Sequence, residues 1–255
     1  MSGGALISFG VQRWSAWAPG LDSNEKWLSW FDAPSSIPAS AEMAPLPWMA
    51  PLQRRRLEPF GRALFQVAHE VLPDIGFEGP IVLASGWGEV GRAVTMLQSL
   101  ASGQGVSPTQ FSLSVHNAAV AQHAIAQQCR GNITALSGAD GSAHAGLLEA
   151  LALIKDGASR VILLSVEQPV PESYAAELQA RPCADVVPSL RAWAVVLDGQ
   201  AQGLSLRQGD DLALSENGPN ASLDLLAFLV GAGRGVSHAL GCGGFSLVRD
   251  PRCAA

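Results

Sequence analysis

Short apolar runs alternate with longer segments of helical spacing along most of this chain. Residues 80–85 (Pro-Ile-Val-Leu-Ala-Ser) are bounded by two glycines and predict a buried strand. The same pattern predicts strands at 5–11, 132–137, 161–166 and 191–197, with a last strand within 238–249. Helical spacing predicts helices at 52–73, 89–101, 115–128, 141–156 and 221–230. Strands that alternate with helices imply an α/β layered architecture.

Two segments interrupt this alternation. Residues 14–51 hold six prolines and five of the seven tryptophans, which predicts irregular structure with short helices packed by aromatic side chains. Residues 198–220 are polar and rich in Gly, Asn and Asp. In the predicted helix at 141–156, one apolar face is formed by Leu147, Leu148, Leu151 and Ile154, and Gly157 stands where a left-handed C-terminal cap belongs.

The composition points to a folded protein with little surface charge. The 255 residues suggest one or two domains, and an apolar content of 48% excludes intrinsic disorder. Charged residues make up 15% of the chain, whereas about 25% is average. We therefore hypothesise a large uncharged interface with a partner. A net charge of −6, with both signs well mixed, gives no sign of nucleic-acid binding.

The four cysteines include no C-x-x-C pair, and no Cys/His group has zinc spacing. We expect no metal, no cofactor and a reducing compartment. The N-terminus lacks the basic and apolar regions of a signal peptide, and no apolar run is long enough to span a bilayer. These features predict a soluble, cytoplasmic protein.

Residues Gly86–Gly91 (Gly-Trp-Gly-Glu-Val-Gly) match the G-x-G-x-x-G pattern of dinucleotide-binding turns, between a predicted strand and a predicted helix. That function also needs an acidic residue about 20 positions later, to hold a ribose hydroxyl. No Asp or Glu lies between Gly91 and Ala139. We therefore interpret the motif as a tight turn built from glycines.

The segment Gly138–Ser142 (Gly-Ala-Asp-Gly-Ser) joins a predicted strand to a long apolar helix. Such an elbow presents one side chain, here Asp140, at a helix N-terminus, where backbone amides and the macrodipole favour negative charge. An ordinary N-cap is the simpler interpretation of the local sequence. A hydrolase with Asp140 as nucleophile and His238 as its late histidine is an alternative with incomplete context.

The remaining histidines, His69, His116, His123 and His144, have no second ligand at metal spacing, which favours packing or solvent-facing roles. Arg54–Arg56 form a basic run on a predicted helix. We interpret this run as a solvated face, with contact to an acidic partner protein as the alternative.

Taken together, five segments resemble the ketosynthases of fatty-acid and polyketide synthesis, in the thiolase superfamily. They correspond, in order, to the family's strand and glycine turn, its Pro…Ser…Asn stretch before a buried helix, its Arg-Gly-Pro tripeptide, the strand closing its first half and its C-terminal glycine loop. In this chain they are Ile81–Gly91, Ser107–Asn117, Arg130–Ile133, Arg191–Leu197 and His238–Phe245.

This resemblance implies a thiolase-like layered fold, truncated to roughly the N-terminal half plus the C-terminal strand. It implies one domain over residues 1–255, in which 198–237 form a divergent connection that replaces most of the second half. The family also implies dimerisation through the strand before the elbow, here 132–137. Low charge content agrees with such an interface, although it does not require one.

The chain departs from the family's catalytic pattern at two independent places. A condensing ketosynthase has a nucleophilic cysteine at the elbow, where counting from Gly131 places Asp140, and Ser142 matches the family's following serine. A carboxylate cannot form the thioester that a thiolate forms. The family's two catalytic histidines come from its second half, and no histidine lies between residues 145 and 237 here. We therefore expect no catalytic residues and a vestigial nucleophile position at Asp140.

Ketosynthase-like subunits without the cysteine resemble chain-length factors, and this short form is similar to those of bacterial aryl-polyene clusters. The resemblance implies a non-catalytic subunit that pairs with a full-length ketosynthase, or with itself, and bounds an acyl chain on an acyl carrier protein. Residues that we expect along the acyl channel or the interface are Phe111, Ser114, Asn117, Ser137, Cys242 and Phe245.

Two alternatives remain open at this point. One is a small acyltransferase or malonyl decarboxylase on the same scaffold, in which Asp140, Ser142 or Cys242 does chemistry. The other is a self-associating structural protein without an acyl channel beside residues 111–120.

Overall fold

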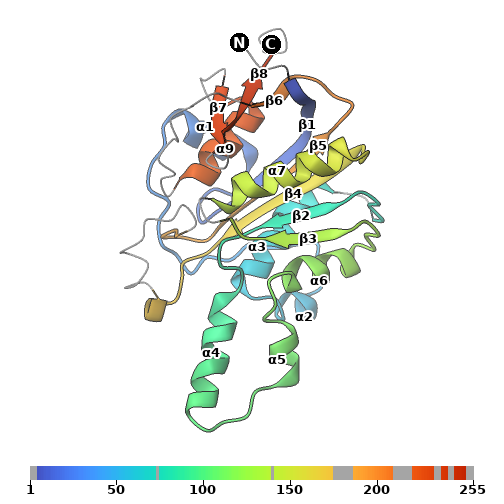
Figure 1. Ribbon diagram of the computed structural model, residues 1–255. Helices are drawn as coiled ribbons and strands as arrows, with labels where there is room; N and C mark the ends of the chain where they lie inside the picture. Colours follow the sequence, from blue (N-terminus) through green and yellow to red (C-terminus); the bar gives the residue numbers. More distant parts are fainter. Residues whose placement is uncertain are drawn as a thin grey trace.

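A computed structural model of the chain describes residues 5–72, 75–138, 141–174, 186–208, 220–232, 237–240 and 244–250. Eight strands in these residues form one mixed sheet in the order β3-β2-β4-β5-β1-β6-β8-β7 (Figure 1). The strands are β1 (Ala5–Trp17), β2 (Ile81–Ala84), β3 (Ile133–Leu136), β4 (Arg160–Glu167), β5 (Arg191–Asp198), β6 (Leu204–Gln208), β7 (Ser237–Leu240) and β8 (Phe245–Arg249). The α/β layered fold predicted from the sequence is thus confirmed.

Parallel pairing is confined to one side of the sheet. Strand β2 pairs in parallel with both β3 and β4, whereas β5, β1, β6, β8 and β7 continue in antiparallel pairs. Parallel neighbours need crossover helices, and α7 (Ser142–Lys155) supplies the crossover from β3 to β4. Strand β1, the first in sequence, lies in the middle of the sheet between β5 and β6.

Helices cover both faces of the sheet (Figure 1), and β2, β4 and β5 are buried along almost their whole length. Val82 and Ala84 of β2 belong to the apolar cluster that includes α7 and α9 (Ala221–Val230). Ile81 and Leu83 belong to the opposite cluster, formed with α3 (Pro59–Val71) and α6 (Ala118–Ala126). The two-residue period of the strand therefore divides one apolar run between two cores.

The tryptophan-rich segment contains α1 (Asn24–Asp32), which Ser23 caps by accepting a hydrogen bond from the backbone N–H of Lys26. Trp27 and Trp30 are buried and pack edge to face, with ring centroids 5.6 Å apart. Short helices packed by aromatic side chains are what the sequence predicts here.

Four expectations about the elements were wrong. Strand β1 continues to Trp17, into the segment expected to be irregular. The expected helix at 52–73 is divided into α2 (Pro51–Arg54) and α3, because Pro59 starts a new helix at its first turn. A short helix, α5 (Pro108–Ser112), precedes α6, which begins three residues later than expected. The polar stretch 198–220 contains β6.

Candidate functional site

The loops after β2, β3 and β4 meet at the carboxyl end of the parallel strands. The Ser137 hydroxyl, after β3, donates to the carbonyl oxygen of Gly86 over 3.1 Å. The backbone N–H of Gly86, after β2, donates over 2.8 Å to the carboxylate of Glu167, the last residue of β4. Three strand ends are therefore joined into one edge, which is where ligands bind in parallel α/β sheets.

The Gly86–Gly91 turn is held by side chains from two sides. Ser85 accepts from the N–H of Gly88 over 3.0 Å, and Gln168 donates to the Gly88 carbonyl over 3.0 Å. Gly88 has φ +54°, and a Cβ there would lie 3.1 Å from Nδ1 of His116. The helix that follows, α4 (Val90–Ala101), runs away from the sheet (Figure 1). A dinucleotide-binding turn needs its helix to pack back on the sheet, so these observations agree with the structural interpretation.

Helix α7 begins at the same edge and lies close against the sheet. Ser142 is fully buried and its hydroxyl accepts from the N–H of Gly138 over 3.0 Å. A Cβ at Gly146 would lie 2.6 Å from Cβ of Ala84, so glycine permits this close approach. Asp140, expected at the vestigial nucleophile position, lies outside the described residues.

The residues predicted to line the acyl channel or the interface lie in two separate parts of the structure. Phe111 and Asn117 are exposed, and Ser114 is half-buried with its hydroxyl donating to the Phe111 carbonyl over 2.8 Å. Ser137 is exposed and tied to the glycine turn as described above. Phe245, in contrast, packs against the core cluster under α7 and α9, and five strands separate β8 from β3. Cys242 lies outside the described residues.

Helices α4 and α5 form an arm that projects from the body of the molecule (Figure 1). Of the twelve residues of α4 only Met96 is buried. Four large apolar side chains of the arm and of the residues just after α5 are more than half exposed: Leu97, Leu100, Phe111 and Val115. These exposed apolar side chains make the arm a candidate interaction surface.

Beyond Arg92, in the first turn of α4, the arm carries no formal charge, and this signal is already present in the sequence. No Asp, Glu, Lys or Arg occurs from residue 93 to residue 129. The last charged group before this stretch is Arg92, which pairs with Glu89 over 2.6 Å at the base of the arm. Burial raises the pKa of the Glu89 carboxyl, and its hydrogen bond with Arg92 opposes that rise. The charged base and the uncharged arm are therefore distinct surfaces.

Strand β3 is an open edge of the sheet, because its described partner is β2 alone. Ile81 of β2 and Ser85, the residue after β2, donate their N–H groups to the carbonyls of Asn132 and Leu136. Backbone groups alternate along a strand, so the N–H and C=O of Ile133 and Ala135 point away from β2. An unpaired row of this kind is a template for a strand of another chain.

A buried polar group fixes α9 on the sheet. The Trp193 indole N–H donates to Ser222 over 2.8 Å, and Ser165 lies 3.2 Å from the same hydroxyl. Arg191 donates to Asn220, just before α9, over 3.2 Å. Burial raises the pKa of the Asp224 carboxyl, against the opposing charge of Arg191. These hydrogen bonds attach part of the segment 198–237 to strands β4 and β5.

Within the described ranges, no group of three or more His, Cys, Asp or Glu side chains could hold a metal ion. None of the helices described is long and apolar enough to cross a membrane. Arg55 and Arg56 are exposed, as the solvated-face interpretation expects, while Arg54 donates to the carbonyls of Pro45 and Leu46.

Comparison with solved structures gives several matches. One chain of the ketosynthase (ApeO) in complex with its chain length factor (ApeC) from Xenorhabdus doucetiae is 26% identical, with a TM-score of 0.77. That match covers 94% of this chain and 98% of the other. The ishigamide ketosynthase/chain length factor is 15% identical, with a TM-score of 0.58, 87% of this chain and 72% of the other being covered. A ketosynthase from module 6 of the bacillaene synthase from Bacillus subtilis 168 is also 15% identical, with a TM-score of 0.55 over 81% of this chain and 44% of the other.

Of the two comparisons at the level of sequence, the one with family models agrees with these folds. A search of curated proteins gave no match. Residues 27–234 match the family model for the N-terminal domain of beta-ketoacyl synthases, and this range includes the glycine turn, the arm and the start of α7. With most of its length matched, the chain belongs to the beta-ketoacyl synthase family, with the thiolase-like fold of that family's N-terminal domain.

Proposed function

We propose that this chain is a non-catalytic, chain-length-factor-like subunit that pairs with a catalytic ketosynthase. The observation that carries the proposal is the near-complete mutual coverage with a chain from a ketosynthase–chain length factor complex. A ketosynthase from Bacillus subtilis is covered over only 44% of its length. This chain therefore corresponds in extent to one subunit of that complex.

The sequence at the elbow supports the absence of condensing activity. Asp140 stands where the family's cysteine is expected, and a carboxylate does not replace a thiolate as the acyl acceptor. Ser142 is buried and its hydroxyl accepts a hydrogen bond from the Gly138 backbone, which suits a structural role at the start of α7. The family's histidine pair has no counterpart between residues 145 and 237.

The open edge of β3 and the uncharged arm supply surfaces for the partner. Pairing through β3 continues the sheet into the other subunit, as the family resemblance implies. We expect the arm's exposed apolar side chains to pack on the same partner, because such packing removes their apolar surface from water. The paired subunits would bound an acyl chain carried on an acyl carrier protein, in fatty-acid, polyketide or aryl-polyene synthesis.

The test is co-expression with a full-length ketosynthase encoded beside this chain, followed by size-exclusion chromatography and a condensation assay with malonyl-carrier substrate. We expect one complex with both subunits, and a change in product length or rate when this chain is omitted. Separate elution together with full activity of the ketosynthase alone would contradict the proposal.

The isolated chain is tested in a second experiment. We expect no turnover of malonyl-carrier substrate and no covalent acylation by mass spectrometry. Turnover that Asp140→Ala abolishes would instead favour a small acyltransferase or malonyl decarboxylase on the same scaffold. A stable homodimer that ignores the ketosynthase would favour self-association.

A further inference from the structure

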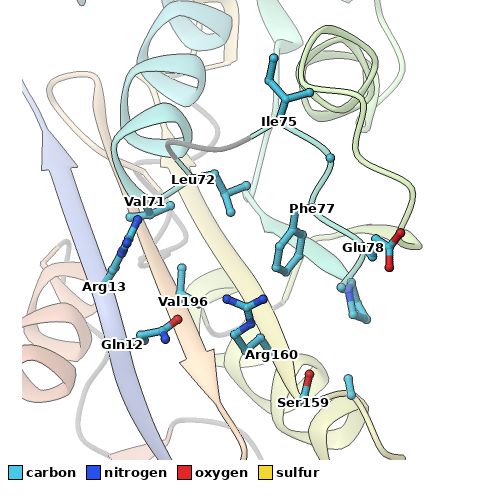
Figure 2. A pocket seen from close by; sticks show the side chains of 14 residues that line it. Gln12, Arg13, Val71, Leu72, Ile75, Phe77, Glu78, Ser159, Arg160 and Val196 are labelled. Carbon is cyan, nitrogen blue, oxygen red and sulfur yellow. The ribbon is translucent and has the colours of Figure 1, made fainter.

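A cavity of about 620 Å³ opens at the amino-terminal ends of β2 and β4, the opposite end of these strands from the candidate site (Figure 2). Its walls come from the middle of β1, the far end of α3, the loop 75–80 and the start of β4. Small-molecule sites typically enclose roughly 300–1,000 Å³. The cavity therefore has the size for a small ligand and uses neither the open edge nor the arm.

Two arginines face this cavity from the same side of the sheet. Arg13 lies opposite Val196 of β5, and Val196 lies opposite Ile162 of β4. Arg160 is two residues before Ile162 and so points to the same face. Figure 2 shows Arg13 and Arg160 on either side of Val196.

Neither guanidinium forms an ion pair with a carboxylate of the described residues. Arg160 lies over the ring of Phe77, 5.9 Å from the ring centroid, and both arginines are exposed. Glu78 is also part of the wall, and Figure 2 shows its carboxylate turned away from Arg160. In a protein with a net charge of −6, two such arginines make a local site for an anion.

Apolar groups surround the two charges. Val71 and Leu72 at the end of α3, Val196 on the sheet and Phe77 in the loop all line the cavity. Gln12 and Ser159 add an amide and a hydroxyl for directional hydrogen bonds. A ligand with one anionic end and an apolar body matches this lining, because each part then contacts groups of its own kind.

The backbone holds the cavity in shape without a ligand. Gln12 is the extra residue of a bulge in β1, which turns neighbouring side chains toward one side. The loop 75–80 is fixed by three backbone hydrogen bonds of 2.8–3.0 Å, which involve Gly76, Phe77 and Pro80. A Cβ at Gly79 would lie 2.6 Å from the carbonyl oxygen of Arg160. Glycine thus lets the loop sit directly on β4, and a preformed cavity lowers the cost of ordering on binding.

We propose that this cavity binds a small organic anion, a carboxylate or a phosphate monoester attached to an apolar chain or ring. Arg13 and Arg160 hold the anionic group from two sides, and guanidinium groups suit both anions because their N–H groups bond oxygen pairs. The apolar part lies against Phe77, Leu72 and Val196. This binding function is separate from the pairing proposed above.

Isothermal titration calorimetry of the full chain tests the proposal with four probes: octyl phosphate below its micelle concentration, octanoate, octanol and inorganic phosphate. We expect at least one of the first two to bind at least about tenfold more tightly than octanol and inorganic phosphate, since charged hydrogen bonds and apolar contact both contribute. The stronger of the two anions identifies the head group. Octanol binding as tightly as both anions, or no binding of either anion, would overturn the proposal.

Arg13→Gln and Arg160→Gln should each weaken the better anion about tenfold while leaving thermal unfolding unchanged, because both side chains are exposed. Arg56→Gln is the matched control, an exposed arginine outside the cavity, and should leave binding unchanged. Equal affinity in the wild type and in both cavity variants would assign the binding to another surface, such as the arm, and would refute the site.

Discussion

Helices α7 and α4 both follow a parallel strand of the sheet through a glycine turn, yet they occupy opposite surroundings. Helix α7 buries eight of its fourteen residues against the sheet, with Gly146 in close approach to Ala84. Helix α4 buries only Met96 and leaves Leu97 and Leu100 more than half exposed. Both helices are largely apolar. The same apolar pattern thus gives a buried helix in one place and an exposed helix in the other, so the pattern alone does not indicate what packs against it.

The largest difference that we expect between the two helices is in stability. Leu147→Ala on α7 should lower the free energy of unfolding by about 3 kcal/mol, because the side chain is fully buried and leaves a cavity. Leu100→Ala on α4, 57% exposed, should lower it by less than about 0.5 kcal/mol. Denaturant titration of the isolated chain measures both values. Equal losses would mean that the arm folds against the body in solution.

Helix α6 is intermediate between α7 and α4 in burial, because one side of it is buried and the other is exposed. A lower pH should destabilise the protein through the buried side. His123 faces α3, fully buried and edge-on to Phe65, and neither ring nitrogen has a hydrogen-bond partner within the described part of the chain. Burial, with a smaller contribution from the charge of His69, lowers the pKa of His123 to about 4. The unfolded chain takes up this proton near pH 6.5, so stability is full above that pH and falls as the pH drops toward 4.

His123→Leu removes this dependence while keeping an apolar side chain of similar size. The difference in unfolding free energy between the variant and the wild type should change by about 2 kcal/mol in favour of the variant when the pH is lowered from 7.5 to 5. Urea titrations at both pH values measure the difference, which cancels the contribution of the carboxyl groups. A constant difference at the two pH values would show that His123 keeps its ordinary pKa.

A substitution on the arm should change the affinity for the ketosynthase and leave the free energy of unfolding nearly unchanged. Phe111→Glu places a charge on a side chain that is 65% exposed, and should weaken binding to the ketosynthase at least about tenfold, or 1.4 kcal/mol. Surface plasmon resonance measures the affinity. Leu52→Glu on α2 is the matched control, with a similarly exposed apolar residue away from the arm, and should bind normally. If both variants bind alike, the arm is not part of the interface.

The smallest effect concerns one backbone group of β3. Ala135→Pro removes an N–H that points away from β2, and should reduce ketosynthase affinity by about 1 kcal/mol with little change in unfolding. Thr134→Pro removes an N–H that faces β2 and should destabilise the isolated chain in the same denaturant assay. A normal affinity for the Ala135 variant would indicate that the partner does not pair with this strand.

Most of the core could be predicted from sequence because its pattern is local. The run 80–85 and the helix 221–230 are bounded by glycines or polar residues, and the structure has them within one residue of the predicted bounds. Strand β6 was missed because only Leu204 and Leu206 are buried in it, and its pairing with β1 and β8 is what makes it a strand. Long-range partners of this kind leave no local signal.

The candidate site was less predictable than the core. The family resemblance named Ser137 and Phe111, but the sequence could not indicate that Phe111 is exposed on a projecting arm. The charge-free stretch 93–129 was available as a signal, and counting charges in windows would have found it. Phe245 was grouped with the others through a family motif, although the sheet order separates β8 from β3.

The central position of β1 has a consequence for how the chain folds during synthesis. This strand is synthesised before the other described strands, yet both of its neighbours, β5 and β6, lie more than 170 residues downstream. Such distant pairing gives a high contact order and a slow search. Until Arg191–Gln208 have been translated, a nascent chain exposes two unsatisfied strand edges next to apolar surface, which makes it a substrate for chaperones.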